Sequence, residues 1–314
     1  MAVTLNGTAA SSSAGAATTS LAVTMPSGAT NGELLVVAFS NAGPTVSIVP
    51  PGAAGYWTQL AQSQDGFGTV DTGVFVRTVD GTEGASQTFS FASSEAVAVA
   101  FRLGGVSATA PVNAVSAAGT ATSGSLTAIT CPSVAATVDG AMVLRIASSV
   151  QVTSFTNPGS HTAIGSTVVN AGASSADPGV AAAYQTQTSQ GATGTAAFVS
   201  GAGSSDRPWV AYTIVIAPAA PTITTQPVST AQYAGLTATF NIAATTSGGA
   251  LSYQWKVNGS NVGTNSTSYT TAALTPSDNG SIVTCVVTDS NGSITSSAAI
   301  LTVLPTSSSS WIKA

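Results

Sequence analysis

Apolar and polar residues alternate along much of the chain. Leu21, Val23 and Met25 are spaced two positions apart, and so are Val74 and Val76, which sends each set to one face of an extended strand. No stretch of twelve or more residues carries the apolar stripe of an amphipathic helix; the alanine-rich segment 11–19 contains helix formers but no such stripe. The pattern predicts an all-β protein.

Further short runs of the same kind predict most of the remaining strands. They are Leu34–Ser40, Val46–Val49, Trp57–Ala61, Gly73–Val79, Gln87–Phe91, Glu95–Leu103, Ala141–Ser148, Ala181–Gln187, Thr195–Val199 and Trp209–Ala217. Turn pairs such as Asn31-Gly32 and Asp139-Gly140 separate them. Many short strands between turns are typical of two antiparallel sheets that cover each other, so we expect residues 1–218 to form one β-sandwich of the jelly-roll type.

A stiff Pro/Ala segment, Ala217 to Pro221, interrupts the chain after the last of these strands. Prolines that cannot donate hydrogen bonds are common in connections between domains. We therefore place a linker at 219–221, a second domain at 222–304, and a flexible serine-rich tail at 305–314.

Two segments of the second domain carry a recognisable pattern. Tyr253-Gln254-Trp255 precedes an Asn-Gly turn, and the segment 274–285 runs through Asp278 and Gly280 to Cys285. These segments resemble bacterial and phage immunoglobulin-like domains. The resemblance implies that Trp255 is the core residue of strand C and that Cys285 points inward from strand F.

The second domain departs from the antibody pattern in two places. Segment 238–243, where strand B is expected, contains no cysteine, so no disulfide can form with Cys285. Ile282 or its neighbour stands where a corner tyrosine is usual. The resemblance therefore implies the fold alone, since this sandwich serves many functions.

The first domain resembles β-sandwich domains of phage virion proteins. The resemblance is carried by Gly32–Phe39, Gly55–Thr58, Val74–Arg77 and Ala98–Arg102, in that order. An appended immunoglobulin-like domain is itself a common arrangement in such proteins. Together they imply a capsid decoration protein or head fibre on the virion surface, with the major capsid protein or other virion proteins as partners.

Charge is scarce, since only 5% of the 314 residues are charged, compared with about 25% in average soluble proteins. With 6 basic residues, none of them clustered, nucleic acid is not expected as a partner. No apolar run approaches the roughly 20 residues that span a bilayer, and the first residues lack the features of a secretory signal. We therefore expect synthesis in the host cytoplasm without membrane insertion.

The residues of common catalytic sites are few. His161, the single histidine, lies in a loop-like segment without a nucleophile signature, which favours a surface histidine. The three glutamates, Glu33, Glu83 and Glu95, flank predicted strands, a placement that suits strand ends better than a glycosidase pair. We expect no enzyme activity and no cofactor.

Metal binding is also not expected. Zinc would have one histidine and two distant cysteines, Cys131 and Cys285, which lie in different predicted domains and should be buried thiols without a disulfide. Calcium ligands could come from the loop aspartates, but these show no D-x-D-x-D spacing, which favours turn formation. They are Asp65, Asp71, Asp80 and Asp206.

Two sets of aromatic residues leave alternatives open. Tyr56 and Trp57, with Phe67, offer a platform on which a sugar could stack, although a tryptophan that begins a strand is more often part of a core. Trp311 and Ile312, at the end of the serine-rich tail, form either a frayed end or a docking peptide.

Two functional hypotheses follow. The first is a structural virion protein that decorates the particle, assembled as a homo-oligomer such as a trimer, although no coiled-coil pattern specifies one. The second is a tail-associated receptor-binding protein that recognises a cell-surface glycan through Tyr56 and Trp57. Both assign the chain to binding and assembly and not to catalysis.

Overall fold

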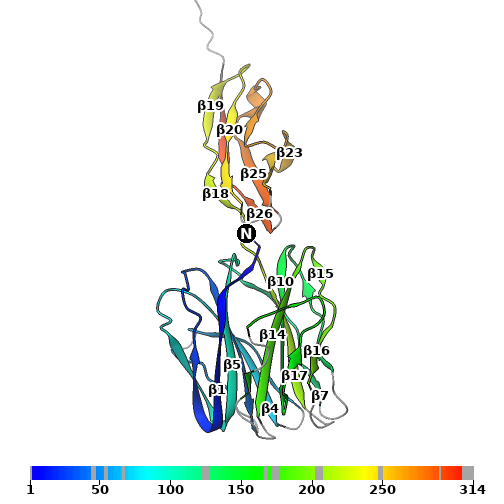
Figure 1. The fold of residues 1–314 in the computed structure, drawn as a ribbon. Helices are drawn as coiled ribbons and strands as arrows, with labels where there is room; N and C mark the ends of the chain where they lie inside the picture. The colour runs from blue at the N-terminus through cyan, green and yellow to red at the C-terminus, as the bar shows by residue number, and fades with distance from the viewer. Residues whose placement is uncertain are drawn as a thin grey trace, which may run out of the picture. The chain divides into compact units, whose positions relative to one another are not determined.

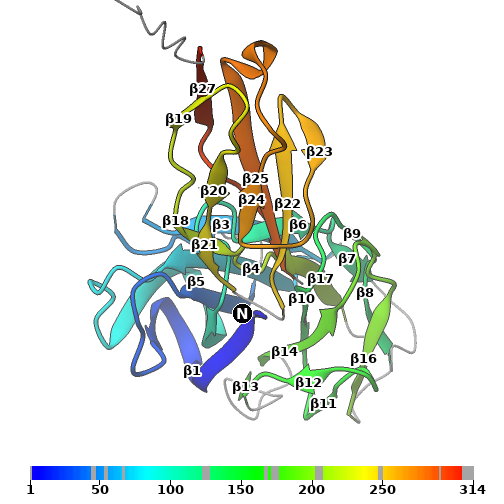
Figure 2. The ribbon, with the colours of Figure 1, turned by 90° about the horizontal axis from the view of Figure 1, so that it is seen from above.

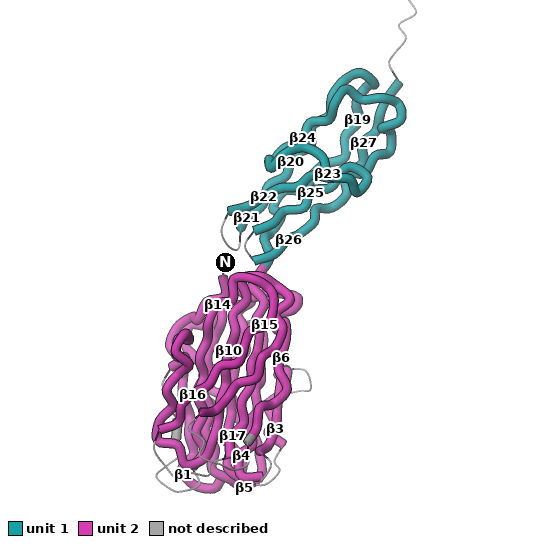
Figure 3. Tube along the Cα trace, turned by 90° about the vertical axis from the view of Figure 1, so that its right-hand side faces the viewer, with its two compact units in different colours: residues 1, 220–314 teal, residues 2–219 magenta. Residues whose placement is uncertain are grey.

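The computed structural model describes residues 2–43, 47–52, 56–65, 68–121, 128–165, 169–170, 177–201, 208–246, 250–289 and 291–305. The chain divides into two compact units, residues 2–219 and residues 220–314 (Figure 3). Regular structure in the described residues is almost entirely strand, with one 3₁₀ turn at Pro276–Asp278. The predicted all-β fold class is confirmed.

The first half of the N-terminal unit is a lobe, called lobe 1, built on one five-stranded antiparallel sheet. Its strands are β1 (Thr4–Thr24), β2 (Leu34–Ala42), β3 (Thr58–Gln64), β4 (Val70–Thr78) and β5 (Ser86–Gly104). Their order across the sheet is β1-β5-β2-β4-β3. The ends of β1 and β5 that lie beyond the main sheet continue as a two-stranded ribbon, in which Ser20–Thr24 pair with residues 86–90.

The second half, called lobe 2, has its strands in a larger number of pieces. They are β6 (Val112–Val115), β7 (Gly119–Ala121), β8 (Ala128–Cys131), β9 (Ala135–Ala136), β10 (Ala141–Val150), β11 (Phe155–Thr156), β12 (Thr162–Ala163), β13 (Val169–Asn170), β14 (Pro178–Gln187), β15 (Gly191–Ala192), β16 (Ala196–Ser200) and β17 (Trp209–Ile216). The main sheet has the order β12-β14-β10-β17-β6, with β7 also on β17 and β13 on β14; smaller sheets join β11-β16-β8 and β15-β9.

The two lobes have the same topology. Each main sheet is centred on one strand, β2 in lobe 1 or β10 in lobe 2. On one side of it lies the last long strand of the lobe, β5 or β17, and on the other side lies the long strand that precedes that one in the chain, β4 or β14. The first segment of each lobe, β1 or β6 with β7, forms the edge beside that last strand. The small β8–β16 pair corresponds to the β1–β5 ribbon. The N-terminal unit is therefore an internal repeat of one structural module.

Glycines mark the repeat in the sequence. Gly32 stands two residues before the central strand β2, with φ of 89°. Gly140 stands directly before the central strand β10, with φ of 67°. A Gly-x-x-Gly turn follows the next flanking strand in both lobes, at positions 81–84 and 191–194, and all four of its glycines have positive φ. Because only glycine adopts this backbone without strain, the same turn has been retained in both copies.

The two main sheets face each other, and the apolar layer between them is the largest core cluster of the unit. Strand β5 contacts β14, β17 contacts β4, and β2 contacts β10. Strand β4 corresponds to β14, and β5 corresponds to β17. The β5–β14 contact and the β17–β4 contact are therefore equivalent to each other, as the two halves of an isologous dimer interface are. Figures 1 and 2 show the blue-to-cyan strands of lobe 1 beside the green strands of lobe 2.

Each main sheet is buried on both faces. In β2, Leu34 and Val36 point into the layer between the lobes, while Leu35 and Val37 point into the separate core of lobe 1. This is why eight of the nine residues of β2 are buried in succession. A doubly covered strand reads as a continuous apolar run, as parallel strands of buried sheets do.

The structure adds detail to the sequence-based expectations in three places. Segment 11–19 is part of β1, because its small side chains pair with β5 and need no apolar stripe. The sandwich expected for residues 1–218 is present as the two facing main sheets, and each lobe adds a core of its own on the outer face of its sheet. Of the predicted strand 46–49, Val46 lies outside the described residues and Val49 makes an isolated bridge to Ser90.

The C-terminal unit is an immunoglobulin-like β-sandwich. Its strands are β18 (Thr222–Thr225), β19 (Thr230–Tyr233), β20 (Thr239–Asn241), β21 (Ala243–Thr245), β22 (Ser252–Val257), β23 (Ser260–Val262), β24 (Ser268–Thr270), β25 (Ser281–Asp289), β26 (Gly292–Thr295) and β27 (Ala299–Leu304). One sheet has the order β19-β27-β25-β22-β23, and β18–β21 and β20–β24 form the other layer. Only β19 and β27 run parallel among the described pairs.

Trp255 lies at the centre of this unit. Its side chain is fully buried and stands opposite Cys285 on the neighbouring strand. The indole N–H donates to the Ser266 carbonyl oxygen at 2.9 Å, and Tyr269 stacks 6.0 Å from the ring. Buried apolar side chains such as Phe240 and Ile242 belong to the same core cluster as Trp255 and Cys285.

Candidate functional site

The turn between β4 and β5 is the most elaborate polar cluster on lobe 1. Glu83 is 6% exposed, and its carboxylate accepts the backbone N–H groups of Asp80 and Gly81 at 2.8 and 3.0 Å. Asp80 in turn accepts the N–H and hydroxyl of Thr82. These bonds hold the turn in one shape, because the N–H groups at its tip have acceptors within the turn itself.

Arg77, at the end of β4, ties this turn to the sheet. Its Nη2 lies 2.7 Å from the Asp80 carboxylate and 3.3 Å from that of Glu83, and it also donates to the Thr82 hydroxyl at 2.6 Å. The Arg77 side chain is 3% exposed, so the ion pair with Glu83 is shielded from water. Hydrogen bonds from Thr82 and the nearby Arg77 charge lower the pKa of Asp80.

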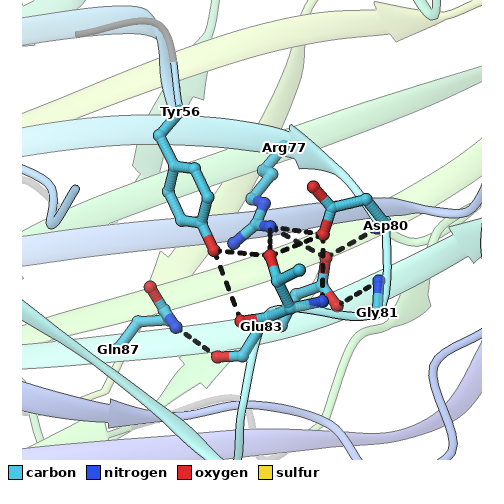
Figure 4. Close-up of polar contacts among 7 residues, drawn as sticks. Tyr56, Arg77, Asp80, Gly81, Glu83 and Gln87 are labelled. Atoms are coloured by element: carbon cyan, nitrogen blue, oxygen red, sulfur yellow. Dashed lines mark hydrogen bonds and ion pairs between the residues drawn. The ribbon is translucent and has the colours of Figure 1, made fainter. Parts of the chain in front are cut away.

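Tyr56 covers this ion pair. The Arg77 guanidinium carbon lies 3.4 Å from the centre of the tyrosine ring, which is cation–π geometry, and the Tyr56 hydroxyl lies 2.9 Å from that of Thr82. Figure 4 shows the ring beside the Arg77 guanidinium, with Asp80 and Glu83 on the other side and Gly81 bonded to Glu83. One face of the ring is therefore already occupied.

Trp57 does not form a sugar platform with Tyr56. The Trp57 side chain is 5% exposed and packs edge-on against Phe89, with ring centres 5.5 Å apart. A buried ring cannot stack on a sugar, so the alternative interpretation, a core tryptophan, fits the structure. The third residue of the expected platform, Phe67, lies outside the described residues.

The surface of the cluster is small but well ordered. The Asp80 side chain is 57% exposed, and Tyr56 is partly exposed beside it. A carboxylate, a hydroxyl and an aromatic edge on a braced turn can contact a polar partner without losing much conformational entropy. This surface, formed by Tyr56, Asp80 and Thr82 and called the Tyr56 surface below, is the candidate contact site. The sequence pattern pointed to Tyr56 but gave no signal for Arg77, which meets the turn only through the tertiary fold.

The other two glutamates also make internal contacts. Glu33 pairs with Arg102 at 2.7 Å and accepts hydrogen bonds from Asn6 and from the Thr30 N–H. Burial alone would raise the pKa of Glu33, but the bonds from Asn6 and Arg102 outweigh it and lower the value. Glu95 on lobe 1 hydrogen-bonds Asp177 of lobe 2, and burial together with that neighbour raises the pKa of Glu95.

His161 lies in a loop, partly exposed, beside a buried arginine. The Nε–H of Arg145 points to the ring Nε2 at 3.4 Å. Burial and the Arg145 charge lower the pKa of His161. Both effects favour the neutral ring, whose Nε2 then serves as an acceptor for Arg145.

The aspartates take different places. Asp65 is buried and accepts the N–H groups of Thr69 and Val70 at 2.7 and 3.0 Å, as expected of a turn residue. Asp71 is 2% exposed, and burial raises its pKa to about 6 despite a hydrogen bond from Gln62. Among the described residues no three acidic, histidine or cysteine side chains gather as metal ligands. Asp206 lies outside them.

The remaining candidate residues are the two cysteines and the two apolar residues of the C-terminal tail. Cys131 and Cys285 are free and buried, and burial raises their pKa values to about 12 and about 11. Trp311 and Ile312 lie outside the described residues. No helix in the described part of the chain has the length and apolarity to cross a bilayer.

No protein-family model and no curated protein matches the chain. Similar solved structures are immunoglobulin-domain proteins. The D1 domain of Duf (Kirre) is 18% identical and covers 27% of this chain and 98% of its own, with a TM-score of 0.24. The tandem Ig repeats of Dlar are 14% identical over 62% of this chain and 91% of theirs, with a TM-score of 0.25.

Immunoglobulin domains 1–5 of Sidekick-1 are 12% identical over 98% of this chain and 60% of their own, with a TM-score of 0.25. TM-scores this low do not establish a common arrangement of domains. The assignment of an immunoglobulin-like fold to the C-terminal unit therefore rests on its own strand order, with β19 parallel to β27 and Trp255 opposite Cys285.

Proposed function

We propose that this chain is a non-enzymatic structural protein that decorates the surface of a bacteriophage particle, bound to the capsid through its N-terminal unit. The main support is the use of the charged groups in that unit. Glu33, Glu83 and Arg145 are each buried and bonded to backbone groups of turns or loops. Such groups brace a scaffold, and their ligand sites are already filled from within the chain.

Rigidity is the property that a decorating protein requires. Two main sheets that are apolar on both faces, joined by a continuous layer, give a unit with little internal freedom. A polar but nearly uncharged exterior attracts few counterions, so attachment should depend only weakly on salt. The appended immunoglobulin-like unit would then be displayed as a separate module.

Binding to particles that lack the protein tests this function. Particles are purified from an infection in which the coding gene carries an early stop codon, and the purified full-length chain is titrated onto them. Saturable binding at a fixed number of copies per particle, changed less than about tenfold between 50 and 500 mM salt, is expected. Absence of binding to these particles would refute the proposal.

The Tyr56 surface favours a second function, adhesion to a cell-surface glycan. An exposed Asp80 carboxylate beside a partly exposed tyrosine edge can hydrogen-bond sugar hydroxyls. A glycan array compares the parent with Tyr56→Ala and with Tyr233→Ala, a control at an exposed tyrosine of the other unit. Binding that Tyr56→Ala alone abolishes supports adhesion, whereas a blank array for the parent removes it.

A further inference from the structure

The immunoglobulin-like unit contains a small apolar pocket of about 190 Å³. Its base is formed by Leu274 and Leu301, which are buried, and its walls include Val257, Val262 and Tyr269, which are partly exposed. Drug-sized ligands occupy pockets of about 300–1,000 Å³, so this one suits a single large side chain. These wall side chains pack against the core of the unit and stay partly exposed.

The pocket lies at the end of the unit from which the chain continues. Leu301 in the pocket pairs with Ser281 at the start of β25, and β27 ends three residues later at Leu304. Three strand residues span about 10 Å. From Pro305 to Trp311 the chain can span roughly 20 Å when extended, so Trp311 is able to turn back and reach the pocket.

Charge at the mouth of the pocket fits the same segment. Asp278 is the only charged residue that lines the pocket, and its Oδ2 accepts both the N–H and the hydroxyl of Thr275. Burial and the Asp278 charge raise the pKa of Tyr269, which places the phenol near that carboxylate. Lys313 follows Trp311 by two positions, so an indole in the pocket would bring an ammonium group to Asp278.

We propose that the Trp311 side chain of the same chain docks in this pocket, with Lys313 beside Asp278. The link supplies a high effective concentration, which lets a modest contact form within one molecule. Tryptophan is a frequent anchor of such contacts because it buries a large area with few rotatable bonds. This inference is independent of the proposed function.

Tryptophan fluorescence of the full-length chain tests the docking. Trp57, Trp209 and Trp255 are at most 7% exposed, so acrylamide should reach Trp311 first if it is free. The difference between the parent and Trp311→Phe isolates the Trp311 signal. We expect a blue-shifted emission and several-fold slower quenching than in the urea-unfolded chain.

A double-mutant cycle identifies the partner charges. Asp278→Asn keeps an acceptor for Thr275 but removes the charge, and Lys313→Gln removes the other. Each single variant should lower the ratio of docked to free Trp311 about two- to fivefold, as expected for an exposed ion pair. The double variant should lower that ratio no further than either single variant does. Lys256→Gln, away from the pocket lining, is the control and should change nothing.

Three results would overturn the proposal. The first is quenching of Trp311 in the native chain at the rate of the unfolded chain. The second is shielding that increases with protein concentration between about 1 and 100 μM, which would mean docking on a second copy. The third is shielding that neither Asp278→Asn nor Lys313→Gln reduces, which would place Trp311 elsewhere.

Discussion

Arg145 holds in lobe 2 the turn that Arg77 holds in lobe 1, and it does so from a different strand. Arg77 reaches the 81–84 turn through the carboxylates of Asp80 and Glu83. Arg145 reaches the 191–194 turn by donating to the carbonyl oxygens of Thr193 and Gly194, both at 3.0 Å. The repeat has thus kept the turn and changed the residues that brace it.

Arg145 takes a place in the sheet of lobe 2 that matches the place of Val37 in lobe 1. Val37 pairs with Phe75 and Ala100 in the sheet of lobe 1, and Arg145 occupies the corresponding place in the sheet of lobe 2. Val37 points into an aromatic core, whereas Arg145 bonds to the Pro132 carbonyl oxygen and to Thr213. Among the described residues no carboxylate pairs with Arg145, so carbonyl dipoles carry the compensation for its buried charge.

Arg145→Met should therefore destabilise lobe 2 strongly. The substitution keeps most of the volume but leaves the carbonyl groups of Pro132, Thr193 and Gly194 without a donor, which we expect to cost about 2–4 kcal/mol in the free energy of unfolding. Urea denaturation followed by circular dichroism measures it. Arg77→Met, which leaves the buried Glu83 carboxylate without its positive partner, should also destabilise the unit by several kcal/mol; an unchanged unfolding free energy in either variant would contradict these roles.

Asp71 should make the N-terminal unit more stable in mild acid than at neutral pH. Its pKa rises from 3.8 to about 6 on folding, so the folded chain holds this proton more tightly than the unfolded chain. Stability then falls as the pH rises from about 4 to about 6 and stays lower above that, by up to about 3 kcal/mol. Glu95, whose pKa is also raised, acts in the same direction, whereas His161 and Glu33, whose pKa values are lowered, act in the opposite direction.

Asp71→Asn should weaken this pH dependence. Urea denaturation of the parent at pH 4.5 and pH 7.5 gives the difference in unfolding free energy, and the variant should reduce that difference by about 1–3 kcal/mol. Asp139→Asn, at an exposed turn position, serves as the matched control. An Asp71→Asn variant that shows the same difference in unfolding free energy between pH 4.5 and pH 7.5 as the parent would refute the assignment.

The sequence predicted strands, turns and the domain type well where one face of a strand is exposed. The strands of the immunoglobulin-like unit alternate between buried and exposed residues, and Ser281 to Asp289 shows this pattern. In the N-terminal unit the runs at Leu34–Ser40 and Trp209–Ala217 correctly predicted β2 and β17, but not that both strands are covered on two sides. Such runs identify a strand but give no sign of how many sheets lie above and below it.

The repeat was missed for a related reason. Equivalent core positions hold different residues, such as Val37 and Arg145, so a comparison of side chains alone finds little. The turns retain the signal, since both lobes have a glycine before the central strand and a Gly-x-x-Gly turn further on. The Tyr56 surface was unpredictable beyond Tyr56 itself, because Arg77 and Asp80 meet through the tertiary fold of that turn.

Both thiols should be inert in the native protein. Cys131 and Cys285 are fully buried, and burial raises their pKa values to about 12 and about 11, so almost no thiolate forms at pH 8. Iodoacetamide should label neither in the folded chain and both in urea, as counted by mass spectrometry. Ser252→Cys adds an exposed thiol as a positive control. Native labelling of either cysteine would show that its region opens.

The layer between the lobes should hold them together without the peptide link. Residues 108–110 connect the lobes in an exposed segment, and the largest core cluster of the unit lies between the two sheets. A protease site inserted there should be cut completely, yet the two pieces should elute as one species in gel filtration, since the interface resembles that of an obligate dimer.

A charge placed in the layer between the lobes tests whether its apolar contacts hold the two cleaved pieces together. Val99 is 1% exposed and faces lobe 2, so Val99→Asp in the cleaved protein should separate the pieces, because an unpaired carboxylate would be buried between two apolar sheets. Thr88→Asp, on the same strand but exposed, should leave them together. If the cleaved parent itself dissociates without denaturant, the covalent connection, and not the layer, maintains the pairing of the lobes.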